Sequence, residues 1–149
     1  MDSNDVDVIV WAARGYPVAI RNPEMYGWID ADETGVIQNV SVKKPLSDPK
    51  TDPIVVGAFT FKKMRNFLRS VEKMKDRGGL INGEYYVDNA INDAISLGLR
   101  CVVFEIDYYI CWGTPNDLRT FEYWQSCFHG WPSHPYGLDK DRNVLHNIK

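Results

Sequence analysis

The chain has 149 residues, of which 44% are apolar, 13% aromatic and 25% charged. A chain of this length and apolar content normally folds as one domain with its own core, which excludes intrinsic disorder as its main state. Seventeen Lys and Arg against twenty Asp and Glu give a formal net charge of −3. This balance gives no overall attraction for nucleic acid or for an anionic membrane.

Targeting signals and cysteine patterns are missing from the sequence. No apolar run reaches the roughly 18–20 residues that span a bilayer. The first residues, MDSNDVD, are acidic and polar where a secretory signal is basic and then apolar. The three cysteines have no CxxC spacing, so neither a disulfide framework nor a structural zinc site is indicated. These features predict a cytoplasmic location, with neither a membrane nor a nucleic acid as partner.

The first third of the chain is predicted to form three strands. Residues 6–11 (VDVIVW) form an apolar, β-branched run typical of a strand buried on both faces. Residues 13–26 contain two prolines and a glycine and are predicted to be a loop. Residues 27–30 and 36–42 then have the pattern of a hairpin, because DETG at 32–35 has the chemistry of a turn.

A strand and two helices are predicted in the middle of the chain. Three prolines between residues 45 and 53 exclude a central strand or a helix interior there. Residues 54–59 (IVVGAF) form another apolar strand, and apolar residues then recur at helical spacing from 61 to 74, with a basic opposite face interpreted as solvated. A second amphipathic helix is predicted over 87–95 and ends at a glycine.

A last strand and a last helix follow. Residues 101–106 (CVVFEI) are strand-like, and TPND at 114–117 is a typical helix start, with Thr114 as N-cap. Strands that alternate with helices, together with one hairpin, predict an α/β domain with a mixed sheet. Apolar residues at helical spacing predict the buried face of the last helix: Leu118, Phe121, Trp124 and Phe128.

Several common enzyme motifs are missing. The sequence contains no GxGxxG, GxxxxGK[ST], GxSxG or HExxH, which disfavours dinucleotide binding and nucleophilic hydrolysis. Polar residues and glycines instead gather near the ends of predicted strands. In open α/β sheets, ligands bind outside the carboxyl ends of the strands. Glycine lets a backbone approach a ligand there, and lysine neutralises phosphate.

Four segments carry a family resemblance: NPEMYGWIDADETGVIQNVSVKKP, IVVGAFTF, NGEYYVDNAI and YYICWGTPNDL. In this order and spacing they resemble the second half of the sugar-phosphate nucleotidyltransferases, the enzymes that make nucleotide sugars. The resemblance extends from about residue 6 to residue 124. It implies a mixed, mostly parallel Rossmann-like sheet with flanking helices and one hairpin, of the nucleotide-diphospho-sugar transferase-like type and incomplete at its N-terminus.

The resemblance also implies a reaction. In this family an oxygen of a sugar 1-phosphate attacks the α-phosphorus of a nucleoside triphosphate, and pyrophosphate leaves. Positioning of the reactants and neutralisation of phosphate charge supply most of the catalysis in such a transfer. The implied partners are a sugar 1-phosphate and a nucleoside triphosphate, or the nucleotide sugar, and the implied cofactor is Mg²⁺.

Five residues match positions that bind the sugar phosphate in the family. The resemblance places Tyr26 and Gly27 along the sugar, Gly57 beside it, and Lys44 on its phosphate. Glu84 matches a glutamate at the start of the helix near the sugar. Each has a simpler alternative: a tight strand start for Gly27, a solvated lysine for Lys44, helix packing for Gly57, and for Glu84 the stabilising effect of a negative charge at a helix N-terminus.

Two positions depart from the family pattern. Lys43 stands where a glutamate is common, and an ammonium group cannot accept hydrogen bonds from sugar hydroxyls. Cys111 stands where a magnesium-binding aspartate is common, and a thiol is a poor ligand for Mg²⁺. Asp107, four residues earlier, is the remaining candidate metal ligand.

The family's Gly-rich loop, which cradles the triphosphate, has no counterpart in this sequence. We therefore expect residues 1–128 to be the C-terminal half of a nucleotidyltransferase-like domain and residues 129–149 to be an extended tail. A missing N-terminal half or a homo-oligomer would complete the protein, and the isolated chain is expected to be inactive.

Two other functions remain open at this point. The same fold could serve as a non-catalytic module that binds a nucleotide sugar or regulates an enzyme, and Lys43 and Cys111 favour this alternative. A glycosyltransferase would need a metal-binding Asp-x-Asp, a spacing that Asp30 and Asp32 have. The hairpin turn is the competing explanation for these two residues, because aspartate is favoured in turns.

Overall fold

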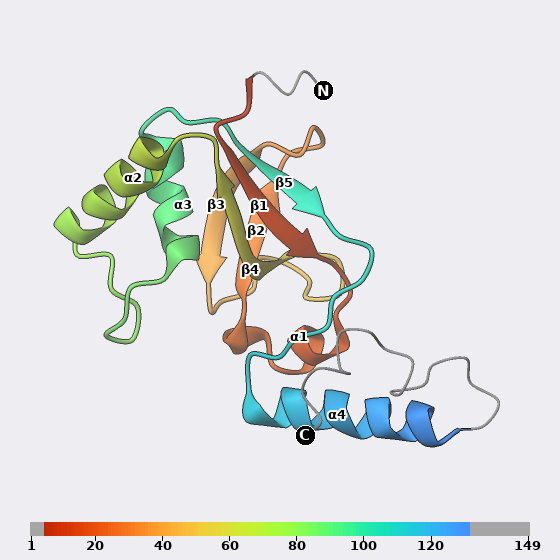
Figure 1. Cartoon of the computed structure of the whole chain (residues 1–149). Helices are drawn as coiled ribbons and strands as arrows, with labels where there is room; N and C mark the ends of the chain where they lie inside the picture. Colours follow the sequence, from red (N-terminus) through yellow and green to blue (C-terminus); the bar gives the residue numbers. More distant parts are fainter. Residues whose placement is uncertain (1–4, 132–149) are drawn as a thin grey trace. The chain divides into compact units, whose positions relative to one another are not determined.

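The computed structural model of the chain describes residues 5–131. The chain divides into two compact units, Met1–Tyr109 and Ile110–Lys149, and each is described by itself (Figure 1). None of the helices in the described part of the chain is long and apolar enough to cross a membrane.

The described part of the first unit is built on a five-stranded sheet in the order β3-β2-β4-β1-β5. Its strands are β1 (Val8–Ala13), β2 (Gly27–Ala31), β3 (Ile37–Val42), β4 (Ile54–Phe61) and β5 (Cys101–Glu105). The predicted mixed sheet is confirmed. The expectation of a mostly parallel sheet is wrong, because among these strands only β1 and β5 pair in parallel and the other three pairs are antiparallel. An apolar run indicates burial on both faces of a strand, but it does not record the direction of the strand.

The predicted hairpin turn joins β2 to β3. The carboxylate of Asp32 accepts hydrogen bonds from the backbone N–H of Thr34 at 2.8 Å and of Val36 at 3.1 Å, and from the Thr34 hydroxyl. These bonds, the one from the Thr34 hydroxyl above all, lower the pKa of Asp32. Gly35 takes the left-handed conformation that the turn needs, with φ of 80°. Asp32 therefore serves the turn, which removes the basis for an Asp-x-Asp metal site.

The hairpin also reaches the far edge of the sheet. Val36 forms an isolated bridge with Val102 of β5, and the N–H of Val103 donates to the C=O of Gly35 at 2.9 Å. The two ends of the strand order therefore approach each other, and the sheet curls around its own core.

Residues 13–26, predicted to be a loop, contain two short helices. These are α1 (Pro17–Arg21) and the 3₁₀ helix η2 (Pro23–Met25). Each begins with proline, whose fixed φ and missing N–H fit the first position of a helix. The indole N–H of the fully buried Trp28 donates to the C=O of Pro23 at 2.9 Å. This bond ties the two helices to the start of β2.

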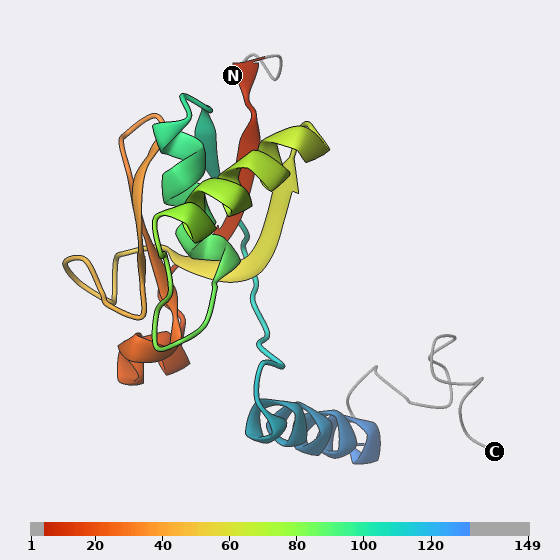
Figure 2. The ribbon, with the colours of Figure 1, turned by 90° about the vertical axis from the view of Figure 1, so that its left-hand side faces the viewer.

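Two longer helices, α2 (Met64–Asp76) and α3 (Val87–Ser96), lie on the same side of the sheet (Figures 1 and 2). Both match the predicted helices. α3 packs against β3, and α2 packs against α3. The core between the sheet and α3 consists of small and branched side chains: Val8, Val10, Ala12, Ile29, Ile37, Val40, Val55, Ile91, Ala94 and Cys101.

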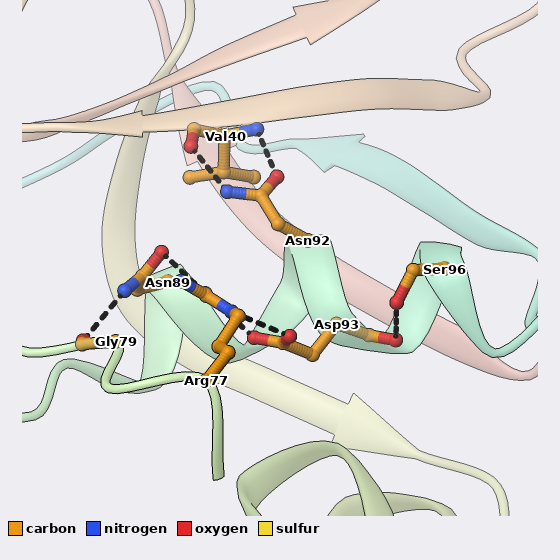
Figure 3. Close-up of polar contacts among 7 residues, drawn as sticks. All are labelled: Val40, Arg77, Gly79, Asn89, Asn92, Asp93 and Ser96. Atoms are coloured by element: carbon orange, nitrogen blue, oxygen red, sulfur yellow. Dashed lines mark hydrogen bonds and ion pairs between the residues drawn. The ribbon is translucent and has the colours of Figure 1, made fainter. Parts of the chain in front are cut away.

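Polar side chains fasten α3 on both sides (Figure 3). The amide of Asn92 bonds both backbone groups of Val40 in β3, accepting from its N–H at 2.8 Å and donating to its C=O at 2.7 Å. On the other side, Arg77 just after α2 donates two bonds of 2.7 Å to the buried carboxylate of Asp93 and one of 3.1 Å to Asn89. The helix is thus tied to the sheet and to α2.

The second unit contains helix α4 (Pro115–Gly130). Its predicted start is confirmed, because Thr114 and Asp117 form a capping box in which the N–H of Asp117 donates to the Thr114 hydroxyl at 3.2 Å. The predicted buried face is wrong, since no residue of α4 is buried and Leu118 is 41% exposed. Apolar spacing identifies a stripe on a helix, but it does not supply the layer that covers the stripe.

The predicted tail, residues 129–149, lies outside the described residues beyond Trp131.

The pair Arg77–Asp93 generates the first prediction. Replacing Arg77 by Ala leaves Asp93, which is 2% exposed, without its cation. We expect the free energy of unfolding to fall by about 2–4 kcal/mol, because an uncompensated buried charge is costly. Urea unfolding followed by circular dichroism measures this change. Arg65→Ala, an exposed position on α2, is the matched control and should change stability by less than about 0.5 kcal/mol; equal losses in both variants would contradict a special role for the buried pair.

Candidate functional site

Gly27 and Asp88 bring the start of β2 into contact with the start of α3. Asp88 is the second residue of α3, and a Cβ on residue 27 would overlap its Oδ2 atom and lie 3.3 Å from Cγ2 of Val55. The glycine at position 27 is therefore required by the carboxyl group beside it.

Lys43 lies next to this contact. It follows β3, its N–H donates to the C=O of Tyr26 at 2.9 Å, and its φ of 61° is in the left-handed region that a side chain rarely adopts. With the backbone in this conformation, Nζ of the Lys43 ammonium group lies 4.8 Å from the centre of the Tyr86 ring. Cation and ring at this distance attract each other.

The charges of two carboxylates act on the Lys43 ammonium group. The Tyr86 hydroxyl donates to Oε2 of Glu84. The interaction with Tyr86 is the main cause that raises the pKa of Lys43, and the charges of Glu84 and Asp88 raise it further by smaller amounts. Burial raises the pKa of Asp88, against the opposing effects of the Asn89 N–H and the Lys43 charge. Gly27, Lys43, Glu84, Tyr86 and Asp88 are called the polar cluster below.

An apolar groove of about 570 Å³ borders the polar cluster. It is lined by Gly57, Ala58, Phe59, Phe61, Met64, Phe67 and Val87. Val87 directly precedes Asp88 in the chain, so the groove reaches the start of α3, which carries Asp88 of the polar cluster. Gly57 has φ of 87°, and a Cβ there would meet no atom within 4 Å. Backbone conformation, and not helix packing, accounts for this glycine.

The structure brings four of the five predicted site residues to this region. Gly27 and Glu84 belong to the polar cluster, Tyr26 is tied to Lys43 through its backbone, and Gly57 lines the groove. Lys44 directly follows Lys43 of the polar cluster in the chain. It is exposed and forms no ion pair with any residue between 5 and 131.

Lys43 is the residue that sequence reasoning missed as part of the site. The family pattern has a carboxylate at this position, so the lysine counted as a departure. Its left-handed backbone and the Tyr86 ring bring it into the cluster, and no local sequence signal shows either. The spacing of Glu84, Tyr86 and Asp88 at a helix start was the one available sign of a polar cluster.

Asp107 belongs to no cluster of metal ligands among the described residues. It is exposed in a bend after β5. Within residues 5–131, no three His, Cys, Asp or Glu side chains gather closely enough to hold a metal ion. The residues present therefore do not fit a preformed Mg²⁺ site.

Comparison with known proteins shows the fold. No protein-family model and no curated protein matches the chain. A solved structure of a nucleoside-diphosphate-sugar pyrophosphorylase from Vibrio cholerae RC9 matches 80% of this chain with a TM-score of 0.64 and 18% identity. A CMP:2-keto-3-deoxy-manno-octonic acid synthetase, solved with CTP, matches 85% of this chain with a TM-score of 0.56 and 12% identity.

These matches establish a nucleotide-diphospho-sugar transferase-like fold, with a mixed five-stranded sheet and flanking helices. The chain spans about half the length of both neighbours, 47% of the first and 52% of the second. At these identities the likeness concerns the fold alone.

The contact between Gly27 and Asp88 generates a second prediction. Gly27→Ala should lower the free energy of unfolding by about 1–3 kcal/mol, because the new methyl group overlaps the carboxyl group. Adding Asp88→Ala should recover most of this loss, a coupling that a double-mutant cycle measures. Gly130→Ala is the control, since a Cβ there meets no atom within 4 Å. Additive losses in the double variant would show that the two residues are not in contact.

The raised pKa of Asp88 generates a third prediction. Because its pKa in the folded state lies above the ordinary value of 3.8, ionisation of Asp88 weakens folding as the pH rises from that value through the folded-state pKa. Asp88→Asn removes this penalty. The free energy of unfolding of the variant, relative to that of the unsubstituted chain, should therefore increase as the pH rises from about 3 to about 7. Urea unfolding across this range measures it; a shift in the opposite direction would show that contacts to Lys43 outweigh burial.

Proposed function

We propose that the chain forms the sugar-phosphate-binding part of a sugar-phosphate nucleotidyltransferase. The complete protein would join a sugar 1-phosphate to a nucleoside triphosphate and release pyrophosphate. The polar cluster carries this proposal, because it combines a cation and two carboxylates beside a groove. The fold of the neighbouring structures agrees with it.

Each group of the cluster has a role in binding such a substrate. Carboxylate oxygens of Glu84 and Asp88 accept hydrogen bonds from sugar hydroxyls. Gly27, which has no side chain, leaves room for the Asp88 carboxyl group beside the backbone. The ammonium groups of Lys43 and Lys44 neutralise phosphate charge, each as a compact point charge.

Binding of this kind contributes to catalysis by positioning. The sugar phosphate has to present one oxygen in line with the α-phosphorus, and holding it in that geometry supplies part of the rate enhancement. Neutralising its phosphate also lowers the repulsion between two anionic reactants. The residues that hold the triphosphate would come from outside this sequence, in line with the half-length match to the neighbours.

The resemblance also implies Mg²⁺, with Asp107 as the candidate ligand of this chain. Any such ion would need ligands from beyond residues 5–131, because no three His, Cys, Asp or Glu side chains gather within that range. The roles given above to the polar cluster need only this chain and its substrate. A location in the cytoplasm, where nucleoside triphosphates are supplied, belongs to the same proposal.

A non-catalytic module that binds a nucleotide sugar is the second candidate. The position of Lys43 favours it, because a cation replaces the sugar-binding carboxylate of the family and is held by Tyr86 and the two carboxylates. Such a module would bind the finished nucleotide sugar more tightly than the sugar 1-phosphate.

Titration calorimetry with the full chain tests the proposal. The ligands are a panel of sugar 1-phosphates and the matching nucleotide sugars. We expect at least one sugar 1-phosphate to bind, with an affinity that Lys44→Ala and Glu84→Gln each lower by about tenfold. Lys50→Ala, an exposed lysine in the loop before β4, is the matched control and should leave the affinity unchanged.

The other outcomes separate the candidates. Binding of a nucleotide sugar without any sugar 1-phosphate would favour the non-catalytic module. No binding of either class would overturn both. With a nucleoside triphosphate and Mg²⁺ added, the isolated chain should release no pyrophosphate; turnover would show that the triphosphate site is present after all.

A further inference from the structure

One edge of β4 carries no partner strand from the described residues over most of its length. β1 pairs with β4 along one side, from Val8↔Phe61 to Ala13↔Ile54. β2 meets the other side only at Trp28↔Ile54. In Figure 2, the upper part of β4 lies at the border of the unit Met1–Tyr109, with no described strand beyond it. This part of β4 is an exposed strand edge.

The register shows which backbone groups face outward. Lys62 donates its N–H to the C=O of Asp7 at 2.8 Å. In an antiparallel pair, every second residue of a strand forms hydrogen bonds to the partner strand. Because Lys62 bonds to the residue before β1, Thr60 is the next residue along β4 that bonds to β1. The N–H and C=O groups of Phe59 and Phe61 therefore point away from β1, toward the open edge.

The surroundings of this edge are apolar. The groove of about 570 Å³ runs along it, and Met64, which lines the groove, is 71% exposed. β4 itself, IVVGAFTF, contains no charged residue and no proline, the devices that commonly protect an edge against pairing. An extended strand that added here would bury apolar surface and satisfy backbone groups together.

Charges at the two ends of the edge have opposite signs. Lys62 and Lys63 follow the C-terminal end of β4. Near the other end, Gly57 and Val87 line the groove, and Val87 directly precedes Asp88 of the polar cluster, in which the two carboxylates outnumber the one ammonium group, that of Lys43. An antiparallel copy of the same edge would set each basic end against an acidic one. The edge is therefore complementary to itself.

We propose that this edge pairs with the same edge of a second copy of the chain. A two-fold axis at Thr60 sets Phe59 opposite Phe61 of the other copy. The outward-facing N–H and C=O groups of these two residues in both copies then form four hydrogen bonds. The same register sets Ala58 opposite Lys62 of the second copy. The interface is isologous, the arrangement of the commonest homodimers.

A pair of substitutions at one exposed residue tests both the dimer and its register. Sedimentation equilibrium of the full chain between about 1 and about 100 μM should give a mass approaching twice the 17.1 kDa of one chain. Ala58→Lys places the new lysine directly opposite Lys62 of the second copy, and the two-fold symmetry creates this pair of like charges twice. The dissociation constant should therefore rise by about tenfold. Ala58→Glu places opposite charges there, and the dissociation constant should stay the same or fall.

Folding and pairing are read separately. Circular dichroism confirms that both variants are folded, and amide hydrogen exchange in the unsubstituted chain should show the Phe59 and Phe61 amides protected more strongly as the concentration rises. A monomer at all concentrations would overturn the proposal and leave the edge to a strand from another polypeptide. A dimer that Ala58→Lys and Ala58→Glu affect equally would overturn the register and hence the interface. Neither result depends on whether the chain binds a sugar phosphate.

Discussion

The position of α3 on the sheet is the constraint on which the candidate site depends. Apolar contacts hold a helix against a sheet without fixing how far it slides along a strand. The Asn92 amide removes this freedom, because it bonds both the N–H and the C=O of Val40. A shift of the helix would leave two backbone groups and one amide without partners, which costs more than the apolar contacts gain. Asp88, one turn earlier, is thereby held against Gly27.

A helix held in this way brings charge to a place where water is partly excluded. The burial that raises the pKa of Asp88 would be more costly without a nearby cation, and Lys43 supplies it. The cation in turn needs a left-handed backbone after β3 and the face of Tyr86. A buried carboxylate at Asp88 and a left-handed backbone at Lys43 are each unfavourable alone, but in the polar cluster each one supports the other. Such local strain is typical of functional sites and persists only where the surroundings enforce it.

The parts of this fold that sequence predicts are those with local chemical causes. The turn at Asp32 and the cap at Thr114 each depend on residues within four positions of one another, and both form as predicted. Strand direction and the site position of Lys43 depend on contacts between segments far apart in the chain. Asn92 and Val40 are 52 residues apart, and neither segment contains a local pattern that indicates the other as its partner. The sequence therefore predicts the elements well and their pairing poorly.

The two proposed uses of the groove are physically linked. Its lining includes Val87, which directly precedes Asp88, so a strand paired along β4 would pass close to the helix start that carries one of the groups proposed to bind a sugar phosphate. Lys63 of a second copy would then approach Glu84 and Asp88, adding a cation where phosphate charge has to be neutralised. If pairing strengthens ligand binding by this route, ligand must strengthen pairing by the same factor, because the two equilibria share one cycle. Association of two sheets through the open edge of β4 would in this way be part of how the site gains its charge balance.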